Sequence, residues 1–350
     1  MQYIWIGASI RAERLMNKWS KLSKDIYPTV LLDNDIGKVG TSLNDVPIDS
    51  VSNIRKYLEG SYEIIITTAY VSEITSQLHG MNIYENIIDY IEKDKEISKL
   101  YLEKNADLHD KKTSKRCFII GTGPSLKDLD LQLLMNDDKI MVNHLYKNEN
   151  LMELNPNFWV IADPAFWLQE KRFLDPIIDA LRNKLTSTQF LIPDEALSHV
   201  TRDLISERNI YHYRLDKSAN YESHTIDFTG VVPLFAQNVI SAALMLAIYL
   251  KYEEIILIGC DHSWWAYSKE EIESGISIPH YYKENAKNVE YIANVIKDIG
   301  YQGLQETIRV QKKEYEALRR IAAQNGIHVC NATPGGYLES FPRKGYQELF

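Results

Sequence analysis

The chain has 350 residues, three cysteines and a formal net charge of -9, with 45% hydrophobic and 25% charged residues. This composition is that of a globular protein with room for two domains, and the negative charge argues against nonspecific binding to nucleic acid or anionic lipid. Cys117, Cys260 and Cys330 are widely spaced in apolar runs, which fits no zinc motif and indicates reduced thiols in a cytoplasmic protein.

Residues 1–92 alternate between strand-like and helix-like segments, a pattern typical of a parallel sheet with crossover helices. The predicted strands are QYIWIGA (2–8), TVLLDND (29–35) and YEIIITTAY (62–70), and the predicted helices are SIRAERLMNKWSKL (9–22) and VSEITSQLHG (71–80). We interpret this part as an N-terminal Rossmann-like domain.

Asp33 and Asp35 follow the second of these strands in a D-x-D arrangement. In many glycosyltransferases such a pair holds a divalent metal, because oxygen ligands at this spacing suit Mg²⁺ or Mn²⁺. The alternative is that the aspartates close a turn, and the segment resembles a small Rossmann-like domain at the front of bacterial sugar-modifying proteins in which they do so. No cofactor is expected, since the loop GASIRA (7–12) lacks two of the three glycines of a dinucleotide fingerprint.

Residues 93–116 carry 13 charges in 24 residues. We expect an exposed helix or a joint there, because so charged a stretch does not bury a face on both sides. Residues 117–350 are then predicted to form a second α/β domain, which makes the chain an α/β protein of two Rossmann-like, parallel-sheet domains. Its predicted strands are CFIIG (117–121), KIMVN (139–143), FWVIAD (158–163), QFLIP (189–193), IYHYRL (210–215), EIILIGCD (254–261) and IHVCNA (327–332), and its predicted helices are 125–135, 234–251 and about 304–325.

The segment 231–250, VVPLFAQNVISAALMLAIYL, has no charge and the length of a membrane span. It contains Pro233, Gln237, Asn238 and Ser241 and runs into a predicted strand, which favours a buried helix between strands. The N-terminus lacks a basic segment ahead of an apolar core, so no signal peptide is predicted. We expect a cytoplasmic protein with at most peripheral contact at the inner face of the membrane.

The segment IIGTGPSL (119–126) places two glycines, a proline and a serine after a predicted strand. Gly121 and Gly123 allow a ligand to approach the backbone, and Ser125 would cap a helix whose first amides point outward. That arrangement suits a phosphate at the carboxyl edge of a parallel sheet. The spacing fits neither the dinucleotide fingerprint nor the P-loop, and a plain strand-to-helix turn is the alternative.

Other segments follow this loop in a characteristic order: VNHLY, VIADPAFW, an apolar helix, EEIILIGCDHSWW and NGIHVCNATPGGYLESF. This succession, over roughly 117–345, resembles the bacterial CMP-dependent α2,3-sialyltransferases. It is also similar to the flagellin-modifying (Maf-type) glycosyltransferases, whose shared domain is named after a hydroxymethylpterin diphosphokinase. The sharpest pieces of the resemblance are the Gly-Pro-Ser loop, LIGCD and NATPGG.

The resemblance implies a set of nucleotide-binding residues drawn from several short segments. They are Gly121, Thr122, Gly123, Pro124, Ser125, Asn143, Asp163, Gln237, Asn238, Gly259 and Asp261. Asn143 falls where the sialyltransferases use an asparagine against the nucleotide, and Asp163 where the flagellin-modifying relatives have an aspartate. Gln237 and Asn238 match a loop that closes over the nucleotide, and Asp261 ends a strand at the edge where open sheets bind ligands.

Transfer from a CMP-linked sugar requires stabilisation of the leaving phosphate and deprotonation of the attacking hydroxyl. The resemblance implies that tyrosines do the first and a histidine the second, without a metal. His280 is the first candidate for the base and His262 the second, because imidazole titrates near neutrality. Tyr267, Tyr281 and Tyr282 are the tyrosines in the matching region. The alternatives are that His280 is a solvated loop residue and that His262 only shapes the pocket.

We therefore predict an enzyme: a metal-independent, inverting glycosyltransferase that moves a sialic-acid-like (nonulosonate) sugar from a CMP donor to a cell-surface glycan or protein. Two other functions stay open: a Mg²⁺-dependent pterin-type diphosphokinase that uses ATP, and a non-catalytic nucleotide-binding subunit of a glycan assembly complex. The expected partners are the CMP-activated donor and a glycan or glycoprotein acceptor, without nucleic acid. Homo-oligomer formation, the donor sugar and the role of the N-terminal domain stay open.

Overall fold

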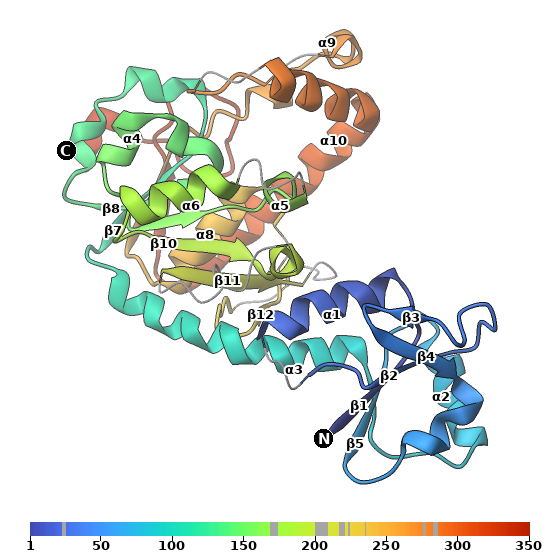
Figure 1. Cartoon of the computed structure of the whole chain (residues 1–350). Coiled ribbons are helices and arrows are strands. Elements are labelled where there is room, and N and C mark those ends of the chain that lie inside the picture. The colour runs from blue at the N-terminus through green and yellow to red at the C-terminus, as the bar shows by residue number, and fades with distance from the viewer. Residues whose placement is uncertain are drawn as a thin grey trace. The chain divides into compact units, whose positions relative to one another are not determined.

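The computed structural model describes residues 1–22, 26–168, 174–199, 209–216, 221–222, 225–234, 236–275, 278–282 and 286–350. These residues form two compact α/β units, each with a mainly parallel sheet flanked by helices (Figure 1). The first unit comprises Met1–Leu102 and the described part of Glu195–Glu207, and the second comprises Glu103–Asp194 and the described part of Arg208–Phe350. The predicted fold class, α/β with two Rossmann-like parallel-sheet domains, is confirmed.

The first unit has a six-stranded sheet in the order β3-β4-β2-β1-β5-β6. Its strands are β1 Gln2–Ile6, β2 Val30–Asp33, β3 Ser42–Leu43, β4 Val46–Ser50, β5 Tyr62–Ile66 and β6 Ile87–Asp89, and its helices are α1 Ile10–Leu22, α2 Val71–Gly80 and α3 Tyr90–Leu102. The short strands β3, β4 and β6 were not predicted. Side chains alternate along β1, so Trp5 packs with α1 and α3 on one face while Ile4 and Ile6 pack with α2 on the other.

The charged segment 93–116 is helical over most of its length. It forms the end of α3 and a 3-10 helix over Glu103–Lys111, and the first unit ends inside it, at Leu102. Asp94 is buried because its carboxylate lies 3.1 Å from Lys18 Nζ on α1. A buried charge is tolerated when it is paired and hydrogen bonded, so Asp94 is buried although most charged side chains of the segment are exposed or half-buried.

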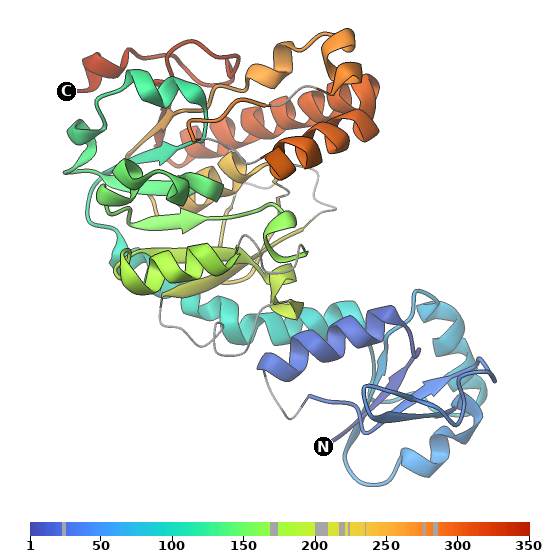
Figure 2. The ribbon, with the colours of Figure 1, turned by 45° about the horizontal axis from the view of Figure 1, so that its top comes forward.

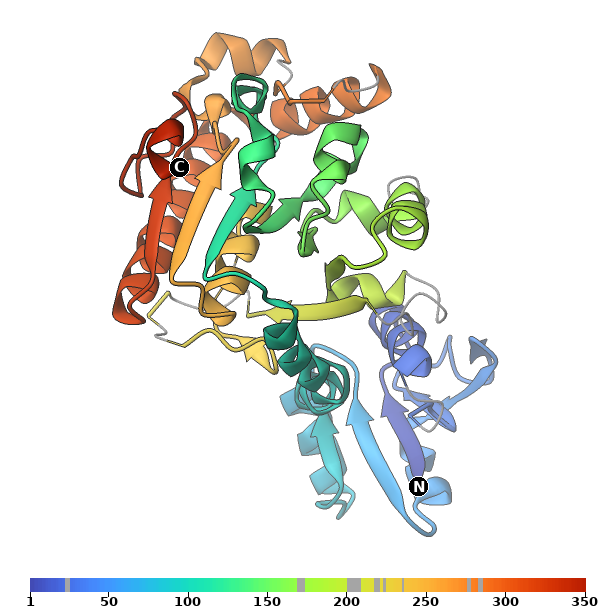
Figure 3. The same cartoon turned by 90° about the vertical axis from the view of Figure 1, so that its left-hand side faces the viewer.

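The second unit has an eight-stranded sheet in the order β12-β11-β10-β9-β8-β7-β13-β14, and every pairing in it is parallel. Its strands are β7 Arg116–Ile120, β8 Asp138–Val142, β9 Phe158–Val160, β10 Gln189–Pro193, β11 Ile210–Leu215, β12 Val231–Val232, β13 Glu254–Ile258 and β14 His328–Asn331. Figure 3 shows β7, β13 and β14 running in the same direction. Strands β8 to β12 lie on one side of β7, whereas β13 and β14 lie on its other side, so the strand order reverses between β7 and β13. Open α/β sheets bind ligands at the carboxyl edge beside such a reversal.

One face of this sheet is covered by α8 (Val239–Tyr249) and α10 (Ala286–Gln324), while α4 (Glu149–Glu153), α5 (Ala165–Leu168) and α6 (Leu174–Asn183) lie in the crossovers from β8 to β10 (Figures 1 and 2). Every residue of α8 is buried, which accounts for its charge-free sequence. Among the residues described, no helix combines the length and apolarity that crossing a membrane requires.

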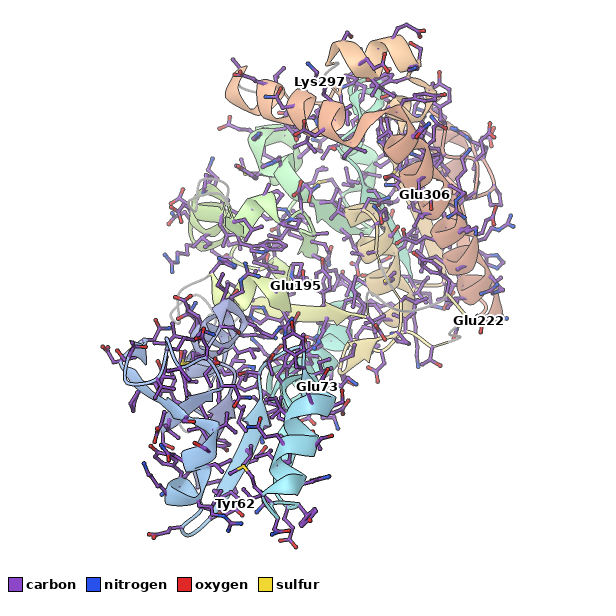
Figure 4. The ribbon with its side chains drawn as sticks, turned by 90° about the vertical axis from the view of Figure 1, so that its right-hand side faces the viewer. Tyr62, Glu73, Glu195, Glu222, Lys297 and Glu306 are labelled. Carbon is purple, nitrogen blue, oxygen red and sulfur yellow. The ribbon has the colours of Figure 1, made fainter. Side chains whose placement is uncertain are left out.

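Two predicted helices of this unit differ from the structure. The helix expected at 304–325 is the second part of α10, which Gly300 interrupts with φ 68° and ψ 171°; Figure 4 shows Lys297 and Glu306 on the two parts.

The helix expected over 125–135 is replaced by two 3-10 turns, Pro124–Asp128 and Leu131–Leu134. Asp130 caps the second turn by accepting a hydrogen bond from Gln132 N–H. Capping of this kind competes with a continuous helix, and the apolar spacing did not reveal it.

Candidate functional site

Two adjoining cavities lie at the carboxyl edge of the second sheet. The first, here called the switch-point cavity, measures about 200 Å³ and is lined by Gly121, Thr122, Gly123, Val142, Asn143, Asn238, Val239, Ile240, Gly259, Cys260, Asp261, His262, Ser263, Trp264, Ile278, Pro279, His280 and Gln311. The second, here called the side cavity, measures about 440 Å³ and is lined by Thr122, Asn143, His144, Asp163, Ala165, Phe166, Gln237, Trp264, Ile278, His280, Tyr282, Ile292, Val295, Ile296, Ile299, Leu304, Thr307 and Gln311. Six residues line both: Thr122, Asn143, Trp264, Ile278, His280 and Gln311.

The GTGPSL loop uses its amides to hold the end of β13. The N–H groups of Gly121 and Gly123 donate to carbonyl oxygens there, both at 2.8 Å. The Ser125 N–H and hydroxyl donate to the Asp261 carboxylate at 3.2 Å and 2.7 Å. The expected helix start with outward amides is therefore not what the loop forms, since three of its amides are already occupied.

The glycines of this loop make room for the end of β13. A Cβ on Gly121 would lie 2.3 Å from Gly259 O, and a Cβ on Gly123 would lie 1.8 Å from Asp261 Oδ2. Gly336 of the NATPGG turn also packs on this strand end, because its Cβ would lie 2.7 Å from the Asp261 backbone oxygen. Asp261 is thereby enclosed, and burial raises the pKa of its carboxyl, although the hydrogen bonds from Ser125 act in the opposite direction.

Asn143 follows β8 in a left-handed backbone conformation with φ 49°. That conformation costs a residue with a side chain on the order of 1 kcal/mol, and the Asn143 carbonyl accepts a hydrogen bond from Trp159 Nε1 at 2.9 Å. Its side chain lines both cavities, and no partner for Oδ1 is found among the described residues. A strained residue with an unused amide oxygen at this edge is typical of a ligand-binding position.

The segment before α8 is anchored to α10. Asn238 caps α8 by accepting the Ser241 N–H at 3.1 Å, and the Gln237 N–H lies 3.1 Å from both carboxylate oxygens of Glu314. Glu314 has no exposed surface, and burial raises its pKa to about 8. With the backbone fixed in this way, Gln237 lines the side cavity and Asn238 lines the switch-point cavity.

Both ring nitrogens of His262 are hydrogen bonded within the protein. Nδ1 lies 3.2 Å from the Cys260 carbonyl oxygen, and Nε2 lies 2.9 Å from the Tyr315 hydroxyl, which also lies 3.1 Å from Asn238 Oδ1. The Tyr315 oxygen in turn accepts from Asn238 Nδ2 at 2.9 Å. Burial lowers the pKa of His262 to about 4. Because Nε2 is occupied and burial lowers the basicity of the ring, His262 fits the pocket-shaping alternative better than the role of a base.

His280 lines both cavities and is held from two sides. Its neighbour Tyr281 donates its N–H to Thr122 O at 2.8 Å, which fastens the segment to the GTGPSL loop. The His280 ring stacks on Tyr282, with centroids 5.0 Å apart and planes within 5° of parallel, and Lys147 Nζ lies 4.7 Å from the centroid of the same Tyr282 ring. His280 therefore stands at the boundary between the two cavities.

Four residues of the predicted set line neither cavity: Pro124, Ser125, Tyr267 and Tyr281. Tyr267 packs instead in a small hydrophobic cluster around Ile272 of α9 (Lys269–Ser274). Of the tyrosines considered, Tyr282 is the one that lines the side cavity.

Asp163 lines the side cavity, and its Oδ1 accepts the Ala165 N–H at 2.9 Å, which caps the short helix α5. Sequence reasoning missed Phe166, Gln311 and the first part of α10. Gln311 is 3% exposed and accepts a hydrogen bond from Trp265 Nε1 at 3.1 Å. The signal that could have revealed it is a polar residue on the buried face of an amphipathic helix.

In the first unit, Asp33 and Asp35 close a turn after β2, as the second interpretation predicted. Asp33 accepts the Ala8 N–H at 2.9 Å and lies 3.0 Å from Lys38 Nζ, and Asp35 accepts the Gly37 N–H at 2.9 Å. Within the part of the chain that the structure describes, no three His, Cys, Asp or Glu side chains gather as a metal site.

Comparison with models of protein families, with curated proteins and with solved structures finds no match to this chain. The resemblance to the sialyltransferases and Maf-type proteins stays a prediction.

Proposed function

We propose that the second unit is an inverting, metal-independent glycosyltransferase that moves a sialic-acid-like sugar from a CMP donor to a cell-surface glycan or protein. One observation carries this proposal. Thr122, Asn143, Asp163, Gln237 and His280 come from five separate segments, were predicted independently of any structure, and line one cavity of about 440 Å³. Such a convergence of polar groups in a concave site is characteristic of a small-molecule binding site.

The chemistry assigns a place to each substrate. The bond between the anomeric carbon and the CMP phosphate oxygen breaks, a bond from that carbon to the acceptor oxygen forms, and the acceptor proton passes to the base. Because the attacking hydroxyl approaches opposite the leaving group, the base must stand between donor and acceptor. His280 lines both cavities, so the donor would occupy the switch-point cavity and the acceptor the side cavity.

Donor recognition would fall to side chains. Asn143 lines the switch-point cavity and its Oδ1 has no partner among the described residues, whereas the Asn238 amide is engaged by Ser241 and Tyr315. The described lining of the two cavities includes neither lysine nor arginine. The leaving phosphate would therefore be stabilised by hydrogen bonds from neutral groups of the switch-point cavity, whose lining includes Thr122 and Ser263.

The first test measures CMP binding by calorimetry in EDTA. Asn143→Gly removes the amide while glycine relieves the left-handed strain, so any loss reflects lost recognition. We expect affinity to fall about tenfold or more, in line with the roughly 1–3 kcal/mol of an unsatisfied buried polar group. Asn155→Gly is the matched control, because Asn155 is exposed and also left-handed at φ 45°.

The second test measures release of CMP from a CMP-linked nonulosonate. We expect His280→Asn to abolish turnover and retain CMP binding, while His328→Asn, at an exposed histidine of β14, changes neither. Binding of ATP with Mg²⁺ in place of CMP would favour the diphosphokinase. CMP binding with no turnover in the unaltered protein would favour a non-catalytic subunit. Equal CMP affinity of the Asn143→Gly and Asn155→Gly proteins would contradict the assigned donor site.

A further inference from the structure

The side cavity has two chemically different ends. Its polar residues come from the carboxyl edge of the sheet and include Thr122, Asn143 and His280. Its other wall comes from the first part of α10, where Ile292, Val295, Ile296 and Ile299 line the cavity. Their spacing places these four side chains on one face of the helix.

Two of these aliphatic side chains are exposed to solvent. Val295 is 37% exposed and Ile299 is 46% exposed, and they lie one helical turn apart. Lys297 and Asp298, between them in sequence, are exposed charged residues of the same helix. The part of α10 beside the cavity thus has a polar outer surface and an apolar cavity wall, and Val295 and Ile299 leave part of that wall exposed to solvent.

We propose that the acceptor is a sugar joined to a hydrocarbon chain, and that this chain lies along the wall formed by Val295 and Ile299. The inference rests on the proposed function, because His280 fixes where the acceptor hydroxyl must lie. With the hydroxyl at His280, the remainder of the acceptor extends into the side cavity, whose far wall offers apolar contact. The volume of about 440 Å³ is within the range of small-molecule sites, and it leaves room for more than the reacting sugar.

The experiment measures binding of butyl, hexyl and octyl β-D-glucoside, at monomeric concentrations and without nucleotide, by titration calorimetry of the full chain. We expect one site whose affinity rises about fourfold with each methylene that it buries. Ile299→Asn should flatten this dependence and weaken octyl glucoside about tenfold. Met135→Asn is the matched control, because Met135 is 52% exposed in the same unit and lines neither cavity.

A second readout separates this inference from the proposed function. CMP affinity should be the same in the Ile299→Asn and Met135→Asn proteins. A chain-length dependence without CMP binding would overturn the proposed function, and the acceptor assignment with it, while the apolar site would remain. CMP binding with a flat chain-length dependence would overturn the inference alone.

Two other results would also overturn it. If octanoate binds as tightly as octyl glucoside, the wall binds the hydrocarbon chain and the sugar contributes nothing to recognition. If Ile299→Asn converts a dimer to a monomer on size-exclusion chromatography and the chain-length dependence is flat, the wall is an interface between copies of this chain.

Discussion

Glu314 offers a direct test of the packing behind the candidate site. Its side chain is completely buried, and both carboxylate oxygens lie 3.1 Å from the Gln237 N–H, which positions the segment before α8. Burial is the main cause of its raised pKa, from an ordinary 4.5 to about 8. Replacing Glu314 with glutamine keeps the size and the acceptor oxygen and removes the ionisation.

The pH dependence follows from proton binding in the two states. Between pH 4.5 and 8 the unfolded chain has an ionised glutamate, whereas the folded chain keeps Glu314 protonated, so the folded state binds one more proton. Its contribution to stability is fully present below pH 4.5 and is lost as the pH rises through 8, with a slope of up to about 1.4 kcal/mol per pH unit. Between pH 6 and pH 8 the unaltered protein should lose about 2 kcal/mol from this group, and the Glu314→Gln protein should not.

Differential scanning calorimetry at pH 6 and pH 8 measures the effect. In a domain of 150–250 residues 1 kcal/mol changes the melting temperature by about 2–4 °C, so the advantage of Glu314→Gln should grow by about 4–8 °C from pH 6 to pH 8. Comparing two proteins at each pH cancels the titration of all other groups. Glu316→Gln, at an exposed glutamate of the same helix, should show no such growth. The reasoning is refuted if the two variants behave alike.

Two further changes test the ion pair of the first unit and the loop of the second. Lys18→Met removes the ammonium that pairs with the buried Asp94 carboxylate. The free energy of unfolding, measured by urea denaturation, should fall by about 3–5 kcal/mol, and adding Asp94→Leu should restore most of it. A double variant no more stable than the single one would contradict this explanation. Gly123→Ala should lower the free energy of unfolding, measured by calorimetry, by about 1–3 kcal/mol. The backbone φ of -69° suits alanine, so the loss would come from the collision of the new Cβ with Asp261. Gly230→Ala, with no atom within 4 Å of the added Cβ, should be nearly neutral, and equal losses would contradict the spatial argument.

The sequence predicted most of the parallel strands, because β-branched runs such as those of β7 and β13 end at glycines, but it missed β4 and β6. It placed the GTGPSL loop and Asp261 at the carboxyl edge of the sheet, since residues after parallel strands share that edge. It could not predict that Ser125 would bind Asp261, because 136 positions separate them and no local pattern links them. For the same reason the sequence did not reveal that Asp94 is buried, because its partner Lys18 lies on α1, 76 positions away.

The GTGPSL loop shows why a motif and its ligand need separate arguments. Free amides at a helix start would attract any phosphate, but here the amides of Gly121, Gly123 and Ser125 hold β13 and Asp261. Proline at position 124 contributes no amide, so it leaves none to be satisfied. The Asp261 carboxylate lines the cavity beside this loop and, whenever it is ionised, would repel a phosphate placed on the loop. A nucleotide in the switch-point cavity would therefore direct its phosphate away from the loop, toward Asn143.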